Sequence, residues 1–529
     1  MVDAGVPPAV IRAARKHLAD RFAADYRRVV ALCLELGRPL DAWHWAERGK
    51  ARRLLDRLEN ARPRLTAAQA RLYEAWVDAE RALQGGGAAP PPFLPPGETP
   101  EAVEQALRRQ LLYEVGSEFV QVDVPAPADL AAHLAALADG RRVLLLQLVP
   151  LPEGDGEPEC DPYVVFALPL HLVAPNAPIP LHAVPLRVEK GAVERSMRTL
   201  EDAVGDLAGA RFRAAEDAFE RLVALLGSAL VQPLLRALDE RGIDAPGMDA
   251  LLLVPGGDLH ALPLHAATLA DGEPLLARVP VCWLGSAGAA RGLADRRAHA
   301  RGQAGPEVHV AMGPASVVLE EAVHETAVVA DAWRERGAVT VRCALEEMTV
   351  DALVRHAGAV RMLHLAGHAD FDEDDPLRSW IDFHGERLTL GRLISDPSLD
   401  FAGMRLCYLS GCDSGLAAGR RSEDLEGLVW TFIHAGAWAV HASLWPVEDA
   451  VSRDYAGVFY ECLAAGHDVA RAARDAALAV RAMGDADGIP RRNPLYWAPF
   501  ALYGNGFQGP WDDSPGAPRA PVRPTPNAT

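Results

Sequence analysis

The sequence predicts an α/β protein, with a mostly parallel sheet flanked by helices and a short α-helical region before it. From about residue 142 onward, short apolar runs alternate with helical segments, as in βαβ units. These runs are apolar throughout, which is typical of strands that are buried on both faces of a parallel sheet. Before residue 84, apolar residues instead recur every three or four positions, the spacing of amphipathic helices.

Composition limits the classes of protein to which the chain can belong. Its 529 residues are too many for one hydrophobic core and suggest several domains. The formal net charge of −19 argues against binding to nucleic acid or anionic membrane through bulk charge. No apolar run nears about 18 residues and no leader-like segment is seen, so we expect a soluble, cytoplasmic protein. The seven cysteines form no CxxC pair, which disfavours a disulfide framework and a zinc ribbon.

Residues 1–84 are expected to form a helical region. The run from Ala42 to Leu55 resembles the second helix of a tetratricopeptide repeat that continues into a capping helix. No second copy follows at the repeat's period of about 34 residues, so we predict a truncated, TPR-like remnant. Residues 85–98 are rich in glycine and proline and are expected to form a linker.

Residues 99–218 are expected to form an α/β spacer that leads into the main domain. Thr99 is a suitable N-cap, so a helix is predicted to begin there. Two strands and a long helical stretch are predicted to follow, at 143–149, 163–168 and 191–240.

The α/β pattern continues to about residue 507. Helical segments such as 320–336 and 424–435 separate its short apolar runs. The predicted strands lie at 251–254, 308–311, 339–341, 360–366, 406–410, 437–443 and 500–503. Residues 508–529 are polar and rich in proline, and we expect a disordered tail.

A histidine and a cysteine each follow a predicted strand. The strand 360–366 ends just before His368, and the strand 406–410 ends just before Cys412. Side chains at the carboxyl ends of neighbouring strands in an α/β sheet point into the crevice where ligands bind. Imidazole and thiol are the groups from which an activated cysteine nucleophile is built. A cysteine peptidase is therefore the leading hypothesis.

The turn around Cys412 favours a reactive thiol over a structural one. It reads Gly-Cys-Asp-Ser-Gly, which leaves the thiol exposed and its backbone N–H groups available to an oxyanion. A cysteine after an apolar strand is otherwise most often a buried structural thiol. Cys407, in the middle of its predicted strand, is expected to be of that kind.

A zinc site is one alternative interpretation. His364 and His368 are four residues apart, a spacing that places both side chains on one face of a helix. On a strand the same spacing separates them by about 13 Å. Because the flanking residues predict a strand, we expect no metal site and assign His364 to the core or to a supporting role.

A nucleophile elbow of the α/β-hydrolase type is a second alternative. Small residues lie two positions before and after Cys412, as that turn requires. The base would then be a later histidine, and His368 would have no role. The candidate bases are His434, His441 and His467.

Several segments follow one another in a recognisable order. The run LLLVPGGDLHALP from Leu251 resembles the pattern PDGxLxxLP, LHLAGH from Leu363 resembles LHFATH, and LSGCDSG from Leu409 resembles LSACETG. The run GLVWTFIHAGAWAVHASLWPVED that ends at Asp449 resembles GLxxAFLxAGAxxVxxSLWxVxD. Together they resemble the CHAT-domain family, caspase- and separase-like cysteine peptidases often found behind tetratricopeptide repeats. The resemblance spans about residues 219–507.

The resemblance implies a caspase-like fold and a cysteine endopeptidase that needs neither metal nor cofactor. It assigns His368 as general base and Cys412 as nucleophile, with an oxyanion hole formed by the backbone N–H groups of Cys412 and Ala369. The family usually has glycine at the position of Ala369, and alanine does not readily adopt positive φ. A catalytically silent scaffold for protein–protein interaction, with the same fold, is therefore the alternative function.

The resemblance also implies that a protein substrate binds as an added strand. The expected substrate-binding residues are Ser410, Asp413, Ser443, Leu444 and Trp445. Trp445 either lines a subsite or is a core aromatic. The acidic run 370–375 is either a solvated loop or, with Asp413, favours a basic residue near the cleavage point. The N-terminal helices are expected to bind a regulatory protein partner.

Overall fold

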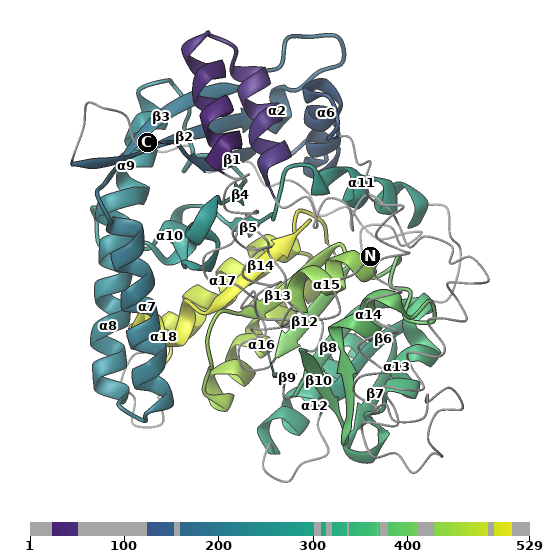
Figure 1. Cartoon of the computed structure of the whole chain (residues 1–529). Helices are drawn as coiled ribbons and strands as arrows, with labels where there is room; N and C mark the ends of the chain where they lie inside the picture. The colour runs from purple at the N-terminus through teal and green to yellow at the C-terminus, as the bar shows by residue number, and fades with distance from the viewer. Residues whose placement is uncertain are drawn as a thin grey trace, which may run out of the picture.

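A computed structural model describes residues 24–50, 124–152, 159–300, 308–313, 320–335, 338–367, 369–370, 379–410, 428–484 and 491–509. Within these ranges, one large sheet carries helices on both of its faces (Figure 1). The predicted linker, the predicted helix from Thr99 and most of the predicted tail lie outside the described residues.

Eleven strands form the large sheet: β1 (Val143–Pro150), β2 (Cys160–Pro169), β3 (His182–Glu189), β4 (Ala250–Val254), β5 (Val281–Trp283), β6 (Val308–Gly313), β7 (Val339–Ala344), β8 (Val360–Ala366), β12 (Leu406–Ser410), β13 (Ala439–Ser443) and β14 (Phe500–Gly504). A small sheet contains β9 (Ala369–Asp370), β10 (Trp380–Phe383) and β11 (Glu386–Thr389).

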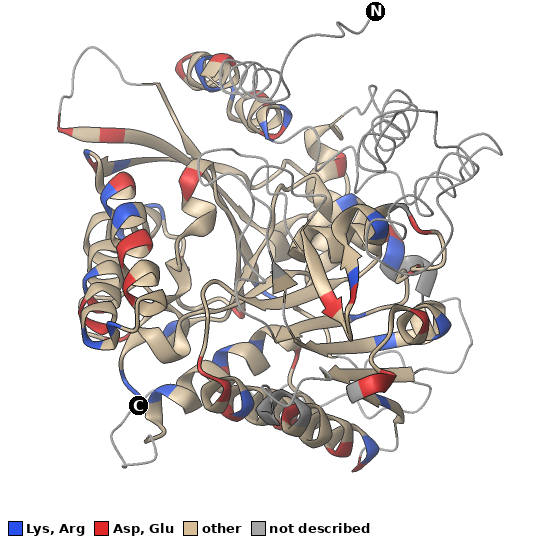
Figure 2. Ribbon diagram, turned by 60° about the horizontal axis from the view of Figure 1, so that its bottom comes forward, with Lys and Arg blue, Asp and Glu red and all other residues tan. Residues whose placement is uncertain are grey.

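The helices follow the same alternation along the chain. They are α2 (Pro39–Gly49), α6 (Pro127–Ala138), α7 (Ala192–Ala208), α8 (Phe212–Leu226), α9 (Gln232–Asp239), α10 (Leu275–Arg278), α11 (Ala289–Ala300), α12 (Glu320–Glu335), α13 (Val350–His356), α14 (Leu390–Ser395), α15 (Leu428–Ala435), α16 (Asp449–Ala464), α17 (Val469–Ala482) and α18 (Pro494–Trp497). Acidic and basic positions are interspersed along the helices (Figure 2).

The strand order of the large sheet is β3-β2-β1-β4-β5-β14-β13-β12-β8-β6-β7. Strands β1, β4, β5 and β14 are parallel to one another, as are β13, β12, β8, β6 and β7. The antiparallel pair β13/β14 joins these two groups. The predicted class, a mostly parallel sheet flanked by helices, is confirmed. Because β1 pairs with β4, strands from both sides of residue 218 belong to one sheet. The domain boundary predicted at residue 218 stays a prediction.

Helices cover both faces of the half of the sheet formed by β13, β12, β8, β6 and β7. Helix α12 packs on β6, β7 and β8 and also against α16, which in turn packs on α17. Right-handed crossovers in a parallel sheet place α13, α14 and α15 on the opposite face, and α14 contacts α15 there. Both faces are therefore covered, which explains why residues of β8 and β12 are buried almost throughout.

Three strand regions were not predicted. In β3, residues alternate between exposed and buried, and Pro185 interrupts the apolar run. Strand β5 has three residues, too few for a periodic signal. The small sheet β9–β11 consists of strands of two to four residues.

One helical stretch is long and apolar enough to be considered for membrane crossing. It spans Phe212–Asp239 and includes α8 and α9. Half of its apolar window is buried inside the protein, and Phe219 on α8 is completely buried. Charged residues such as Glu220 and Arg221 lie on its exposed side. The buried residues recur at helical spacing, as expected for an amphipathic helix that packs on a core.

The N-terminal helices pack directly on the sheet. A helix over residues 24–35 and α2 lie side by side, and the rings of Tyr26 and Trp45 are 6.0 Å apart (Figure 1). Trp43 is completely buried and donates its Nε1–H to Gln147 Oε1 of β1 at 2.8 Å. This single described hairpin leaves the TPR-like nature of the region a prediction.

Two charged side chains of this helical hairpin are buried at its contact with the sheet. Gly288 donates its backbone N–H to Glu47 Oε2 at 2.8 Å, and Lys50 Nζ donates to Pro255 O at 2.7 Å. Burial raises the pKa of the Glu47 carboxyl, while the nearby charge of Lys50 and two backbone hydrogen bonds oppose that rise. The two residues thus join α2 to the segments that follow β4 and β5.

Replacing Lys50 by methionine is therefore expected to lower the free energy of unfolding by about 3 kcal/mol, because Glu47 would keep a buried charge without its compensating cation. Urea unfolding of the full chain measures the change. Lys190→Met, at an exposed position, is the matched control and should change stability little. Equal stability of the two variants would contradict this role for Lys50.

Candidate active site

The carboxyl ends of β8 and β12 lie next to each other. The two strands are parallel and in register from Met362 opposite Leu406 to Ala366 opposite Ser410. Just past the end of β8, Gly367 donates its backbone N–H to Ser410 O at 3.0 Å. The two strand tips that precede His368 and Cys412 are therefore held together by the backbone.

The side chains of the predicted dyad lie outside the described residues. His368 is flanked by described positions, whereas Cys412 and Asp413 fall in the range 411–427. The pairing of the dyad and the position of Asp413 stay predictions. The structure does describe the two strands, β8 and β12, that precede these residues.

Ala369 begins the small sheet. It is half-buried, belongs to β9 and lies opposite Ile381 in an antiparallel pair. The described non-glycine residues with positive φ are Asp139, Asn176, Ala210 and His384, so Ala369 is not among them. Its extended backbone can be adopted by alanine as readily as by glycine.

Ser410 takes part in a buried polar network with α12. Its hydroxyl donates to Glu325 Oε2 at 3.0 Å, and Glu325 Oε1 lies 3.2 Å from His364 Nε2. On the other side of its ring, His364 Nδ1 lies 3.0 Å from the hydroxyl of Tyr460 on α16. The Ser410 hydroxyl is thus engaged by Glu325, and one carboxylate links the ends of β8 and β12.

A stack of aromatic rings continues this network beneath the strands. The Tyr408 ring lies between those of His364 and His441, at centroid distances of 4.8 and 4.5 Å. Tyr455 donates its hydroxyl to Ala473 O at 3.0 Å, so the contact of 2.8 Å between its oxygen and His441 Nε2 uses the ring N–H as donor. All three stacked rings are buried.

Burial sets the protonation of this layer. It lowers the pKa of His441 to about 3, with further contributions from His364 and His265. It also raises the pKa of the Cys407 thiol well above its ordinary value. Cys407 is completely buried and is the structural thiol that its mid-strand position predicted.

The predicted substrate-binding segment begins at the last residue of β13 and is bonded to β14 and to Pro499. Ser443 lies opposite Phe500 of β14, and Leu444 donates its backbone N–H to Pro499 O at 2.8 Å. Trp445 is completely buried, with its ring 4.5 Å from that of Phe219 and its Nε1–H donated to Leu495 O. Of the two roles considered for Trp445, a subsite wall or a core aromatic, its burial agrees with the core aromatic.

The histidines of the alternative interpretations occupy other environments. His364 is completely buried on β8, and its two ring nitrogens face Glu325 and Tyr460, so it has a supporting position. His441 is enclosed by aromatic rings, and His467 lies in the turn between α16 and α17. His434 is buried at the end of α15.

Glu325 is the residue of this network that sequence analysis missed. It is buried, although it belongs to a helix whose composition resembles a solvated surface. The sequence carries only a weak signal of its burial. Glu325 shares a helix face with apolar residues such as Val329 and Ala330, and that face packs on β8.

His441 makes a pH dependence of stability testable. Its pKa in the folded protein is about 3, against an ordinary value of 6.5, so the unfolded chain binds one more proton between those values. The stability that the neutral ring contributes is present above pH 6.5 and is lost as the pH falls, by about 1.4 kcal/mol per unit.

His441→Phe is therefore expected to reduce the slope of unfolding free energy against pH, between about pH 6 and 4, by close to one proton. Tyr455 keeps its bond to Ala473 in this variant. Urea unfolding at several pH values gives the slope, and His182→Gln, at an exposed position of β3, should leave it unchanged. An unaltered slope in His441→Phe would show that the ring is already protonated or exposed.

Comparison with known proteins places the chain in a family. A family profile described as the CHAT domain matches residues 220–505. A search among curated proteins found no match. The structural comparison found gingipain R (RgpB), described as an Arg-specific cysteine proteinase, with 12% identity and a TM-score of 0.36, covering 56% of this chain and 69% of that one.

A second similar structure is the separase–securin complex of Saccharomyces cerevisiae. It shares 10% identity at a TM-score of 0.46, and the match covers 77% of this chain but only 33% of that chain. Complexed pro- and mature domains of RgpB from Porphyromonas gingivalis share 13% identity at a TM-score of 0.36, over 55% and 69% of the two chains. Because the family profile matches more than half of its length, the chain belongs to the CHAT domain family.

Proposed function

We propose that the protein is a cysteine endopeptidase in which His368 and Cys412 form the catalytic dyad. The supporting observation is the register of the strands that precede them. Ala366 and Ser410 lie opposite each other, and each proposed catalytic residue comes two positions later in its own chain segment. Neighbouring strands lie about 4.8 Å apart, so side chains at equal offsets are within reach of each other.

The proposed chemistry uses these two side chains and nearby backbone groups. The imidazole of His368 takes the thiol proton as the sulfur attacks the scissile carbonyl, and later returns it to the leaving amine. The backbone N–H groups of Cys412 and Ala369 donate to the oxyanion that forms. Neither step requires a metal or a cofactor.

The proposed substrate is a protein segment bound in extended form beside Ser443 and Leu444. Since β14 and Pro499 already bond one edge of this segment, the substrate would not pair along that edge. Asp413 would favour a basic residue near the scissile bond. Trp445 would support the segment from the core rather than contact the substrate with its ring.

The proposed setting is the cytoplasm, with a regulatory protein partner bound near the N-terminal helices. Six cysteines in the described part of the chain are free, which fits a reducing compartment: Cys33, Cys160, Cys282, Cys343, Cys407 and Cys462. Because α2 packs on β1, a partner bound there would act through the sheet itself.

Labelling with a peptidyl acyloxymethyl ketone tests the dyad. We expect the probe to modify Cys412 at a rate that falls about 100-fold or more in His368→Ala, because that variant lacks the general base. Peptide mass spectrometry identifies the modified cysteine. His384→Ala, at a turn between β10 and β11, serves as the matched histidine control and should retain full labelling.

Cys407 should stay unmodified in the folded protein because burial keeps it protonated and inaccessible. Labelling of Cys412 that is equal in the parent and in His368→Ala would contradict the dyad. Absence of labelling at Cys412 would favour the scaffold function. Loss of labelling in His434→Ala, with His368→Ala unaffected, would favour the hydrolase elbow.

Restoring glycine at position 369 gives a separate prediction. Because Ala369 has extended backbone, Ala369→Gly should not raise kcat/KM for a cleaved peptide and should slightly lower stability through the entropy of the unfolded chain. Steady-state kinetics on both proteins provides the comparison. A large gain in activity would show that the oxyanion turn requires a left-handed residue.

A further inference from the structure

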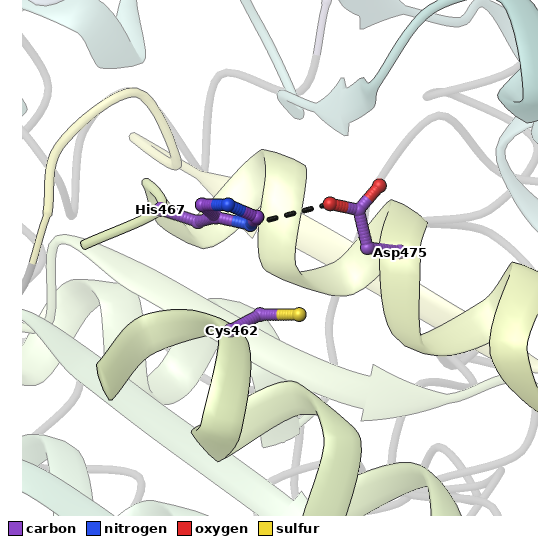
Figure 3. A group of neighbouring side chains, drawn as sticks. All are labelled: Cys462, His467 and Asp475. Carbon is purple, nitrogen blue, oxygen red and sulfur yellow. Dashed lines mark ion pairs between the residues drawn. The ribbon is translucent and has the colours of Figure 1, made fainter. Parts of the chain in front are cut away.

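A sulfur, a nitrogen and an oxygen donor meet at the turn between α16 and α17. Cys462 lies near the end of α16, His467 lies in the connecting turn, and Asp475 lies on α17 (Figure 3). The turn is closed by a backbone hydrogen bond from His467 N to Cys462 O at 3.1 Å. None of the three side chains takes part in the proposed peptidase site.

The donor atoms lie close enough to share one ion. One donor atom from each residue lies within 4.8 Å of the other two, and His467 Nδ1 is 3.2 Å from Asp475 Oδ2. His467 Nδ1 is shielded from solvent, and its contact with Asp475 Oδ2 does not have the geometry of a hydrogen bond. Around a tetrahedral zinc ion such atoms would lie roughly 3.5 Å apart, so modest side-chain rotations suffice.

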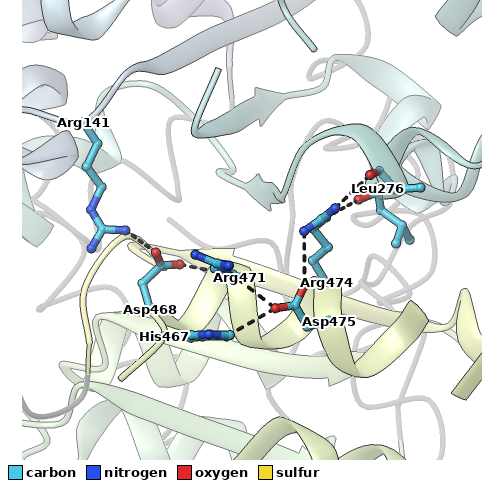
Figure 4. A network of polar contacts seen from close by, with 8 residues as sticks. Arg141, Leu276, His467, Asp468, Arg471, Arg474 and Asp475 are labelled. Atoms are coloured by element: carbon cyan, nitrogen blue, oxygen red, sulfur yellow. Dashed lines mark hydrogen bonds and ion pairs between the residues drawn. The ribbon is translucent and has the colours of Figure 1, made fainter. Parts of the chain in front are cut away.

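The carboxylate of Asp475 is held by its outer oxygen. Arg474 donates to Asp475 Oδ1 at 3.1 Å and also to Leu276 O and Ala277 O, at 2.9 and 2.8 Å (Figure 4). This anchored guanidinium orients the carboxylate and leaves Oδ2 directed at His467. Metal sites commonly use such outer partners to fix a ligand.

Arg471 is the charge that competes with a cation. Its Nε lies 3.6 Å from Asp475 Oδ2, but its side chain is mostly exposed and can move away. Burial, with the carboxylates of Asp475 and Glu461, raises the pKa of the Cys462 thiol. A divalent cation would replace both the thiol proton and the contact with Arg471, leaving two anionic ligands to balance its charge.

We propose that Cys462, His467 and Asp475 bind one divalent transition-metal ion of the Zn²⁺ class, with water at the fourth position. Mixed sulfur, nitrogen and oxygen ligation suits Zn²⁺ better than Ca²⁺ or Mg²⁺, which take oxygen ligands. Structural zinc sites usually have four protein ligands, whereas this site would have three protein ligands and one water molecule.

The ion joins two helices that support the layer beneath the candidate active site. Helix α16 also carries Tyr455 and Tyr460, which contact His441 and His364. Fixing the end of α16 to α17 would therefore stabilise the layer on which β8 and β13 rest. The expected gain in the free energy of unfolding rises with the concentration of free metal ion, as it does for any ligand that binds only the folded state.

Cobalt substitution tests the site with the full chain. The background is Cys412→Ala, so that metal binding at the proposed dyad cannot contribute. Titration with Co²⁺ should produce a thiolate-to-cobalt charge-transfer band and visible bands typical of four-coordination, at one equivalent, and Zn²⁺ should displace the cobalt. Calorimetry with Zn²⁺ alone gives the affinity.

Cys462→Ser should abolish the charge-transfer band, and His467→Ala and Asp475→Asn should each weaken Zn²⁺ binding by about 100-fold. Cys160→Ser, a half-buried cysteine on β2, is the matched control and should bind as the background does. Circular dichroism establishes that each variant is folded before titration, and the two non-cysteine variants test the site if Cys462→Ser does not fold.

Absence of the charge-transfer band in the folded background protein would overturn the proposal. So would a band that survives in Cys462→Ser, or Zn²⁺ affinity that is unchanged in both His467→Ala and Asp475→Asn. Loss of binding in Cys160→Ser equal to that in Cys462→Ser would also overturn it. These outcomes do not depend on whether the protein is a peptidase.

Discussion

The backbone hydrogen bond from Gly367 to Ser410 is the contact on which the proposed site depends. It extends the parallel pairing of β8 and β12 by one step beyond the last paired residues, Ala366 and Ser410. Buried parallel strands have a strongly specified register, because a slip of one residue would turn every side chain to the opposite face. The two segments that carry histidine and cysteine therefore leave the sheet at one level and at one edge.

A second constraint holds this edge from below. Glu325 contacts Ser410 and His364, one residue on each strand, and His364 is bonded on its other side to Tyr460. A buried polar network of this kind is stable only when its members find partners, and removal of one member leaves others unsatisfied. Helices α12 and α16 thus take part in fixing the relative position of the strand ends, without contributing a proposed catalytic group.

Much of the fold could be predicted because its strands are buried on both faces. The continuous apolar runs of β8 and β12 identified both strands to within their observed bounds. Strand β3 escaped prediction because Pro185 interrupts it and half of its residues are exposed, and β5 because three residues carry no periodic signal. The pairing of β13 with β14 in antiparallel orientation depends on the path of α16 and α17, which no local pattern encodes.

The environment of some residues at or near the candidate site could be predicted from the sequence, and that of others could not. Cys407 was assigned to the core from its place in a strand, and burial agrees. Glu325, Glu47 and Lys50 escaped attention because charged residues on helices usually face solvent. Their burial follows from what packs against each helix: β8 against α12, and β1 against the N-terminal hairpin. Sequence alone cannot supply that information, since it arises from contacts between segments far apart in the chain.

The central claim is that positions 368 and 412 are neighbours across two adjoining strand tips, and oxidative cross-linking measures this directly. Two cysteines form a disulfide without backbone movement only when their Cα atoms lie about 4.4–6.8 Å apart, close to the spacing of adjacent strands. A His368→Cys variant should therefore form a disulfide between positions 368 and 412 under mild oxidation, seen as a linked peptide by mass spectrometry. Free, alkylatable thiols at both positions after the same treatment, in a protein that remains folded, would contradict the account.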